Sequence, residues 1–255
     1  MTYRLPGRAV HHVNVEPGMQ WRTTLRRAWT DPDTGTIIGS GRYTANGSPT
    51  GPGSPITTHG TVALRAATRT GDTISVDAAL YADGAGRLDP MEGTGSTTLW
   101  RNGIRVGSSA TPGSGDFRVT GADARYTMKI ESQRGEPHRL STRTTVDWTF
   151  RSAHVAGSRP LPLPLVRFSP PLDTHNSAPA GSTLPIPLSV TGPARVNRIE
   201  VSFDDGATWT RAVVWATTLI VRHPPGTGFV SLRATASDND GNTVDQTIIR
   251  AYRYA

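Results

Sequence analysis

Residues 202–209, Ser-Phe-Asp-Asp-Gly-Ala-Thr-Trp, decide the fold class of this chain. They follow the β-forming Ile199-Glu200-Val201 and lead into Arg211-Ala212-Val213-Val214-Trp215. Two runs of β-formers on either side of Asp-Asp-Gly predict a hairpin, because Asp tolerates a tight turn and Gly adopts the positive φ that the reversal requires. We therefore expect these side chains to serve backbone geometry, with a direct ligand role as the alternative.

Turn formers and β-formers dominate the rest of the chain as well. The 255 residues include 27 Gly and 20 Pro, which indicate many turns, while six Trp, six Tyr and five Phe argue against disorder. Long stretches of helix formers are missing. We predict an all-β protein with short strands, long enough for two domains that each bury a core.

A proline-rich segment divides the chain into two predicted β-sandwich domains. Residues 1–158 contain a succession of strands and a Gly/Pro/Ser/Thr loop at 45–60, and we expect a jelly-roll-like sandwich. Alternating prolines predict a semi-rigid connector or an edge segment, rather than a central strand, at 159–170. Residues 171–255 have the size and strand spacing of an immunoglobulin-like or fibronectin III-like sandwich.

Alternation of apolar residues predicts the faces of individual strands. One expected core face holds Tyr126, Met128 and Ile130, and a second holds Val146, Trp148 and Phe150. Asn102-Gly103 predicts a hairpin within residues 97–106. In the C-terminal part we expect strands at 183–190, 196–203, 208–215, 219–223, 228–236 and 242–252.

The opening stretch also matches a known hairpin motif. The spacing Ser-x-Asp-x-Gly-x-Thr-Trp, formed by Ser202, Asp204, Gly206, Thr208 and Trp209, resembles the Asp-box of sialidases and of many secreted β-modules. In that motif the Asp and Ser hydrogen-bond the turn backbone and the Trp packs beneath it. The resemblance therefore implies a structural role for these five residues.

A second acidic turn raises the question of a cation. Asp238, Asp240 and Asn242 lie in an Asp-x-Asp-Gly-Asn turn, but the further carboxylates and the terminal Glu of a calcium loop are missing. We expect turn chemistry here, with a weak Ca²⁺ loop as the alternative, and no other cofactor or metal. The adjacent His11 and His12 point to opposite faces of a strand and cannot share an ion.

Short strings imitate protease motifs without completing a catalytic site. They are Asp33-Thr34-Gly35, His59-Gly60-Thr61 and His154-Val155-Ala156-Gly157. Neither a Gly-Thr-Ser-Met nor a Gly-x-Ser-x-Gly string supplies a nucleophile, and a second Asp-Thr-Gly is missing. We expect this chain not to be an enzyme.

Charge and aromatic content narrow the choice of partners. The net charge is +7 and only Lys129 among the 27 basic residues is lysine, but the arginines are scattered and match no nucleic-acid motif. An anionic cell-wall polymer, attracted by the positive net charge, remains a candidate partner. Trp21, Trp29, Trp100 and Trp215 are candidates for a polysaccharide platform, with core packing as the alternative. No apolar run reaches the length of a membrane helix.

Five longer strings point to a family. They are TLWRNG (98–103), LSTRTTVDWTFRS (140–152), VSFDDGATW (201–209), FVSLRATASD (229–238) and DGNTVDQTIIRAY (240–252). They resemble the C-terminal, non-catalytic region of large secreted subtilisin-like serine proteases of Streptomyces and related actinobacteria.

The resemblance implies accessory β-modules that lie behind a subtilisin-like catalytic domain in cis. It implies an extracellular location, with the signal peptide outside this chain, because residues 1–6 lack an apolar core. None of the family's catalytic Asp, His and Ser residues can be assigned to a position here. The alternative is an independent secreted protein that binds carbohydrate or the cell wall.

Overall fold

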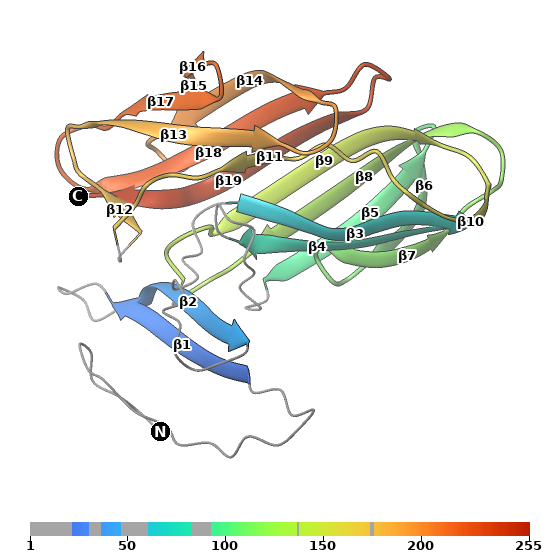
Figure 1. Ribbon diagram of the computed structural model, residues 1–255, viewed down its shortest axis with the longest axis horizontal. Helices are drawn as coiled ribbons and strands as arrows, with labels where there is room; N and C mark the ends of the chain where they lie inside the picture. Colours follow the sequence, from blue (N-terminus) through green and yellow to red (C-terminus); the bar gives the residue numbers. More distant parts are fainter. Residues whose placement is uncertain (1–21, 31–36, 47–60, 83–92, 137, 174–175) are drawn as a thin grey trace.

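One long sheet forms the back of the molecule (Figure 1). The computed structural model describes residues 22–30, 37–46, 61–82, 93–136, 138–173 and 176–255, with the backbone alone for 22–30, 37–46 and 61. The long sheet has the order β15-β14-β18-β19-β9-β8-β5-β6. Its strands are β5 Thr94–Arg101, β6 Ile104–Ser109, β8 Ala124–Gln133, β9 Arg143–Ser152, β14 Arg195–Ser202, β15 Thr210–Arg211, β18 Gly228–Ser237 and β19 Thr243–Tyr254.

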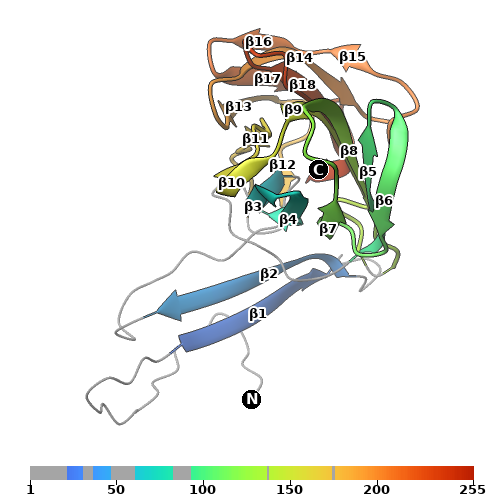
Figure 2. The ribbon, with the colours of Figure 1, turned by 90° about the vertical axis from the view of Figure 1, so that its right-hand side faces the viewer.

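Two smaller sheets lie on one face of the long sheet (Figures 1 and 2). The N-terminal cover sheet has the order β10-β3-β4-β7, and the C-terminal cover sheet has the order β11-β13-β17-β16. The strands of the first are β3 Thr61–Gly71, β4 Thr73–Ala82, β7 Ser114–Arg118 and β10 Val155–Pro160. Those of the second are β11 Val166–Phe168, β13 Thr183–Val190, β16 Val213–Trp215 and β17 Thr218–Arg222.

The remaining strands are β1 Arg22–Thr30 and β2 Ile37–Asn46, which pair with each other, and β12 Ser177–Ala178, which runs parallel to the end of β19. The other ladders among the described strands are antiparallel. The described residues contain no helix, and therefore none that could span a bilayer. The prediction of an all-β sandwich fold is confirmed.

The core lies between the long sheet and its two covers. Both predicted core faces are buried: Tyr126, Met128 and Ile130 of β8, and Val146, Trp148 and Phe150 of β9, are at most 1% exposed. The indole Nε1 of Trp148 donates a hydrogen bond of 2.6 Å to the carbonyl of Pro164. This bond ties the middle of the long sheet to the proline-rich segment.

That segment contributes to the core and runs between edge strands β10 and β11 of the two cover sheets. Leu161, Leu163 and Leu165 are buried, and both main-chain groups of Val166 bond to the buried side chain of Gln246 in β19. Prolines between buried leucines suit this position, because a segment that packs against a sheet without pairing along its length needs few backbone donors.

The long sheet also passes directly from one predicted domain to the other. Strand β9, from the first predicted domain, pairs with β19, from the second, over residues 143–149 and 243–249. Val146 lies opposite Gln246 and Trp148 opposite Val244, so both contribute to one buried face. The division at 159–170 stays a prediction about independent folding, but the two parts share one sheet.

The predicted hairpins form at the expected turns. Asn102 and Gly103 have positive φ and join β5 to β6, as the Asn-Gly signal predicted. After the second hairpin the expected strand 208–215 is split: Thr210–Arg211 pairs with β14, whereas Val213–Trp215 pairs with β17 in the other sheet. The single run of β-formers crosses from one layer to the other at Ala212. The loop predicted at 45–60 lies almost wholly outside the described residues.

Candidate functional site

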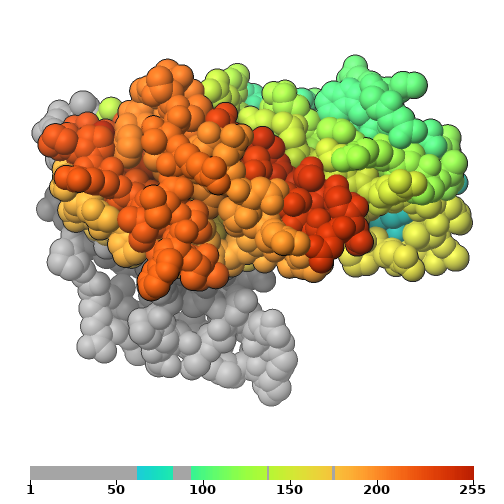
Figure 3. All heavy atoms as spheres, turned by 90° about the horizontal axis from the view of Figure 1, so that it is seen from above, coloured from blue at the N-terminus to red at the C-terminus, as the bar shows by residue number. Residues whose placement is uncertain are grey.

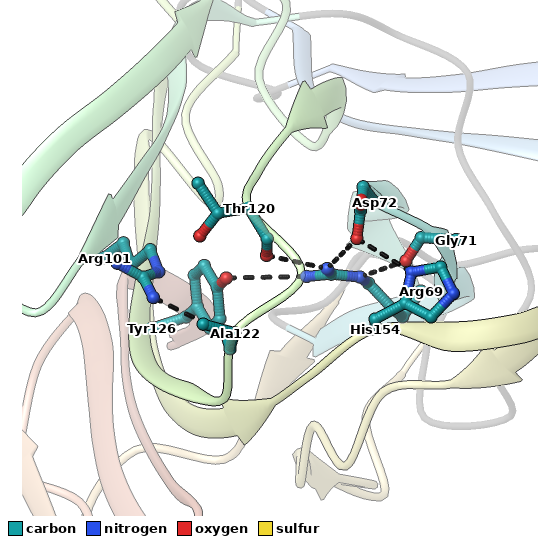
Figure 4. Close-up of polar contacts among 8 residues, drawn as sticks. All are labelled: Arg69, Gly71, Asp72, Arg101, Thr120, Ala122, Tyr126 and His154. Atoms are coloured by element: carbon teal, nitrogen blue, oxygen red, sulfur yellow. Dashed lines mark hydrogen bonds and ion pairs between the residues drawn. The ribbon is translucent and has the colours of Figure 1, made fainter.

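A buried arginine holds the end of the N-terminal cover sheet to the long sheet (Figure 4). Arg69, at the end of β3, is only 1% exposed. Its guanidinium donates to the carbonyls of Gly71 and Thr120, to the carboxylate of Asp72 and, at 3.5 Å, to the hydroxyl of Tyr126 in β8. A buried charge is costly unless it is paired and hydrogen-bonded, and these contacts meet that need.

Asp72 also contacts His154, the residue at the head of the predicted protease-like string. The Nδ1 atom of His154 lies 3.0 Å from Oδ1 of Asp72, and both side chains are about half exposed. Hydrogen bonds from His154 and Arg69 lower the pKa of Asp72. An Asp–His pair is two thirds of a nucleophilic triad. Among the described residues no hydroxyl hydrogen-bonds to the other ring nitrogen of His154.

The hairpin at 202–209 is closed by its own side chains. The hydroxyl of Ser202 donates to Asp204 and accepts from the main-chain N–H of Gly206 at 2.9 Å. Oδ1 of Asp204 accepts from the main-chain N–H of Thr208 at 2.8 Å, and Oδ2 accepts from its hydroxyl. Hydrogen bonds from Thr208 and Ser202 lower the pKa of Asp204 to about 2. These contacts match the predicted structural role of Ser202, Asp204 and Thr208.

The tryptophan of the same hairpin packs against the turn. Gly206 has a φ of +87°, and a Cβ atom there would meet the Trp209 ring at 3.2 Å and Ile249 at 2.8 Å. The half-buried Trp209 ring also lies under the guanidinium of Arg233, whose Cζ is 4.6 Å from the ring centroid. Both the backbone conformation and the close packing therefore require Gly206.

The turn at 238–242, for which a weak cation loop was the alternative prediction, uses its carboxylate internally. Oδ1 of Asp238 accepts from the main-chain N–H groups of Asp240 and Asn242, each at 2.9 Å, and Oδ2 accepts from the Asn242 amide. The carbonyl oxygen of that amide accepts from the main-chain N–H of Arg151. Among the described residues no three acidic or histidine side chains gather as a metal site would require.

The tryptophans predicted as a platform are only partly described. Trp21 lies outside the described residues, and the side chain of Trp29 in β1 is likewise outside them. Trp100 of β5 is half-buried, and it alternates with the buried Leu99. It therefore lies on the outer face of the long sheet, away from the core.

A groove that the sequence analysis missed opens at the end of the C-terminal half. It has a volume of about 700 Å³ and lies where the end of β13, the start of β14 and strand β16 meet. Figure 3 looks onto this end, where the orange residues of β13 to β17 form much of the surface. The apolar part of the lining includes Leu188, Val190, Val196, Ile199, Ala212 and Val214.

The rim of this groove is basic and includes exposed apolar side chains. Arg195, Arg198 and Arg211 line it, and no acidic side chain belongs to the described lining. Val213 is 67% exposed, and the neighbouring Trp215 of the same strand is 79% exposed. The sequence predicts the run Val213-Val214-Trp215 as part of a hairpin strand, but its apolar side chains do not reach the core.

Neither a comparison with protein families nor one with curated proteins gives a match to this chain.

Proposed function

We propose that this chain is a non-catalytic accessory module of a secreted subtilisin-like serine protease, and that it acts by binding. The resemblance of the five strings to the C-terminal region of such proteases supports the class. The groove beside β16 carries the binding role, because an open groove that combines exposed apolar side chains with arginines is suited to binding a ligand. The catalytic domain, in cis, is the partner we expect.

The same proposal covers the finer features of the fold. We assign the C-terminal half to the immunoglobulin-like or fibronectin III-like sandwiches, and the hairpin at 202–209 to the Asp-box type. Support comes from the hydrogen bonds of Ser202 and Asp204 to the turn backbone. In this role the module would support the stability of the protease, limit access to it, or attach it to a surface.

The reading frame upstream of Met1 gives the first test. We expect it to encode a subtilisin-like catalytic domain, and we expect deletion of residues 61–255 to shorten the half-life of the mature protease on heating. A frame without such a domain, or a protease whose half-life and substrate range are unchanged by the deletion, contradicts the accessory role.

Assays of the purified chain test the expectation that it is not an enzyme. Neither the wild-type chain nor its His154→Ala variant should hydrolyse peptide or ester substrates. Hydrolysis by the wild type that His154→Ala abolishes would instead make the Asp72–His154 pair part of a catalytic site.

A specific observation favours a second candidate function, carbohydrate or cell-wall binding by an independent secreted protein. Trp215 is 79% exposed on β16, and Val213 and Val214 of the same strand line the groove together with three arginines. An exposed indole is suited to stacking on a sugar ring, and the arginines are suited to attraction of anionic polymers. This function predicts retention on peptidoglycan that Trp215→Ala reduces and Trp100→Ala does not. Equal retention of both variants and the wild type would argue for attraction by net charge alone.

A further inference from the structure

Among the described strands, β16 pairs only with β17, so its outer edge is open and the main-chain polar groups of that edge face the groove. The N–H of Leu188 donates to the carbonyl of Thr217, so Thr217, Leu219 and Val221 direct their main-chain groups toward β13. Thr218 and Ile220 then face β16, where they pair with Trp215 and Val213. The N–H and C=O of Val214 therefore point away from β17.

Ala212, earlier in the same run, shows which strand lies beside this edge. The N–H of Ala212, two residues before Val214 and on the same side of the strand, donates to the carbonyl of Ile199 in β14 at 2.9 Å. Beyond that bond the two sheets diverge. Residues 195–198 of β14 pair with β18 alone among the described strands, so they leave a second open edge across the groove from Val214.

Other edges of the cover sheets carry features that prevent pairing. The opposite edge of the C-terminal cover sheet is formed by residues 183–187 of β13, which precede its pairing with β11. At Pro185 and Pro187 the main chain faces away from β17, and proline has no N–H to offer a further strand. In the N-terminal cover sheet the edge strand β10 contains Gly157 and Pro160. The edge at Val213–Trp215 contains neither proline nor charge, although exposed apolar edges are usually protected.

The charge of the groove indicates the character of its ligand. Arg195 donates to the amide oxygen of Asn239, and Arg198 shares the carboxylate of Glu200 with Arg233. Arg211 is exposed and has no ion-pair partner among the described residues. A ligand with carboxylates would complement this lining, which contains three arginines and no acidic residue in the described part.

We propose that the groove binds an extended acidic polypeptide segment, which adds as a strand to the open edge of β16. Val214 exchanges two main-chain hydrogen bonds with one residue of the segment, apolar side chains of the segment contact Val196 and Val214, and its carboxylates approach Arg195 and Arg211. This inference rests on the proposed binding function and gives its ligand class.

Two other occupants fit the groove less well. A polysaccharide lacks the regular N–H and C=O groups that the edge at Val214 can pair with. A second copy of the chain would bring two sets of arginines together, and the described lining of each groove has no carboxylate to compensate for that repulsion.

The variant Val214→Pro tests the strand directly. Proline removes the N–H that faces the groove and leaves the ladder with β17 intact, so the thermal midpoint should stay unchanged. Val214→Ala is the matched control, because it keeps the N–H. The probes are two short capped, fluorescein-labelled peptides, one alternating valine with glutamate and the other alternating valine with lysine.

We expect the glutamate peptide to bind and the lysine peptide to bind at least about tenfold more weakly. Val214→Pro should weaken the glutamate peptide by about tenfold or more and Val214→Ala by only about two- to threefold. The double variant Arg195→Gln/Arg211→Gln should lose about tenfold and reduce the salt dependence. Binding should also slow hydrogen exchange of the Val214 amide.

Three results would overturn the proposal. They are equal affinity of Val214→Pro and the wild type, equal affinity for the two peptides, and absence of saturation by the glutamate peptide at about 1 mM. A dimer in sedimentation velocity that Val214→Pro dissociates would identify a second copy as the occupant. If the wild-type module and its Val214→Pro variant stabilise a protease equally, the result contradicts strand addition but agrees with the proposed accessory function.

Discussion

The N-terminal and C-terminal cover sheets occupy the same face of one long sheet, yet they meet it differently. At the first, Arg69 is buried between β3 and β8, and the edge strand contains a glycine and a proline. At the second, Gln246 attaches β11, prolines protect one edge, and the edge at β16 diverges from β14 to leave a groove. One layered arrangement therefore yields a closed end and an open end.

The two halves of the molecule therefore differ in the edges of their cover sheets and not in the packing of their core. Both halves bury alternating apolar residues of the long sheet to the same degree, as Trp148 and Leu232 illustrate with 0% exposure each. What differs is whether the last strand of the cover is protected. Variants at the two attachment points and at the edges can test this comparison.

The largest effect is expected at the closed end. Arg69→Ala removes a buried guanidinium and leaves Tyr126 and two carbonyls without their donor, so we expect the free energy of unfolding to fall by about 3–5 kcal/mol. Denaturant unfolding measures it. Arg65→Ala is the control, because its pair with Asp77 is about half exposed and contributes less than about 1 kcal/mol. Equal losses would show that burial of Arg69 is unimportant.

The attachment of the open end should be somewhat weaker. Gln246→Leu leaves both main-chain groups of Val166 unsatisfied, and at about 1–3 kcal/mol for each buried group we expect a loss of about 2–4 kcal/mol. The exposed Gln133→Leu should change stability by less than about 0.5 kcal/mol. A loss at Gln246 that matches the control would contradict the proposed attachment of β11 through this side chain.

The exposed edge should affect association rather than stability. Trp215→Lys should change the free energy of unfolding by less than about 0.5 kcal/mol and should slow aggregation on heating, as light scattering would measure. Ile104→Lys is the matched control: Ile104 is 75% exposed but lies at the tip of the β5–β6 hairpin. Equal effects of the two substitutions would show that general surface hydrophobicity is responsible, and not the open edge.

The smallest effects concern two carboxylates, Asp204 in the turn after β14 and Asp147 in β9, that respond to pH in opposite directions. The pKa of Asp204 is lowered from 3.8 to about 2, so its contribution to stability is present above about pH 4 and is lost as pH falls through 2. Burial raises the pKa of Asp147 to about 6, so the fold favours its protonated form and loses that contribution as pH rises through 6.

Substitution by asparagine separates the two carboxylates. Unfolding measured from pH 2 to pH 8 should show that Asp204→Asn flattens the acidic limb, whereas Asp147→Asn flattens the decline between about pH 4 and pH 6. If either variant retains the wild-type pH profile, the corresponding carboxylate does not contribute as its contacts indicate.

Much of the local structure could be predicted from the sequence. The bounds of β13 agree with the expected 183–190, and the burial of β8 and β9 follows the predicted alternation, because a strand with one buried face shows that face in its sequence. The contacts of Ser202 and Asp204 with their own turn were implied by the resemblance to the Asp-box motif. Such bonds join residues that lie within a few positions of each other.

The candidate groove could not be predicted in the same way. The run from Thr210 to Trp215 looks like one strand, and no local signal indicates that it changes sheets at Ala212. The prolines at 160–164 predicted a connector or an edge segment, because proline weakens strand pairing, but the burial of Leu163 depends on a sheet made by residues distant in sequence. The sequence likewise gave no reason to select Arg69.

The sequence by itself determined the all-β class, the core face of each strong strand and the chemistry of the turns, since these depend on side-chain alternation and on bonds between near neighbours. Only the tertiary structure decided that β9 pairs with β19, that Arg69 is buried, and that β16 leaves an open edge beside three arginines. These features arise when distant edges and faces meet, and any strand with unpaired N–H and C=O groups is compatible with many partners.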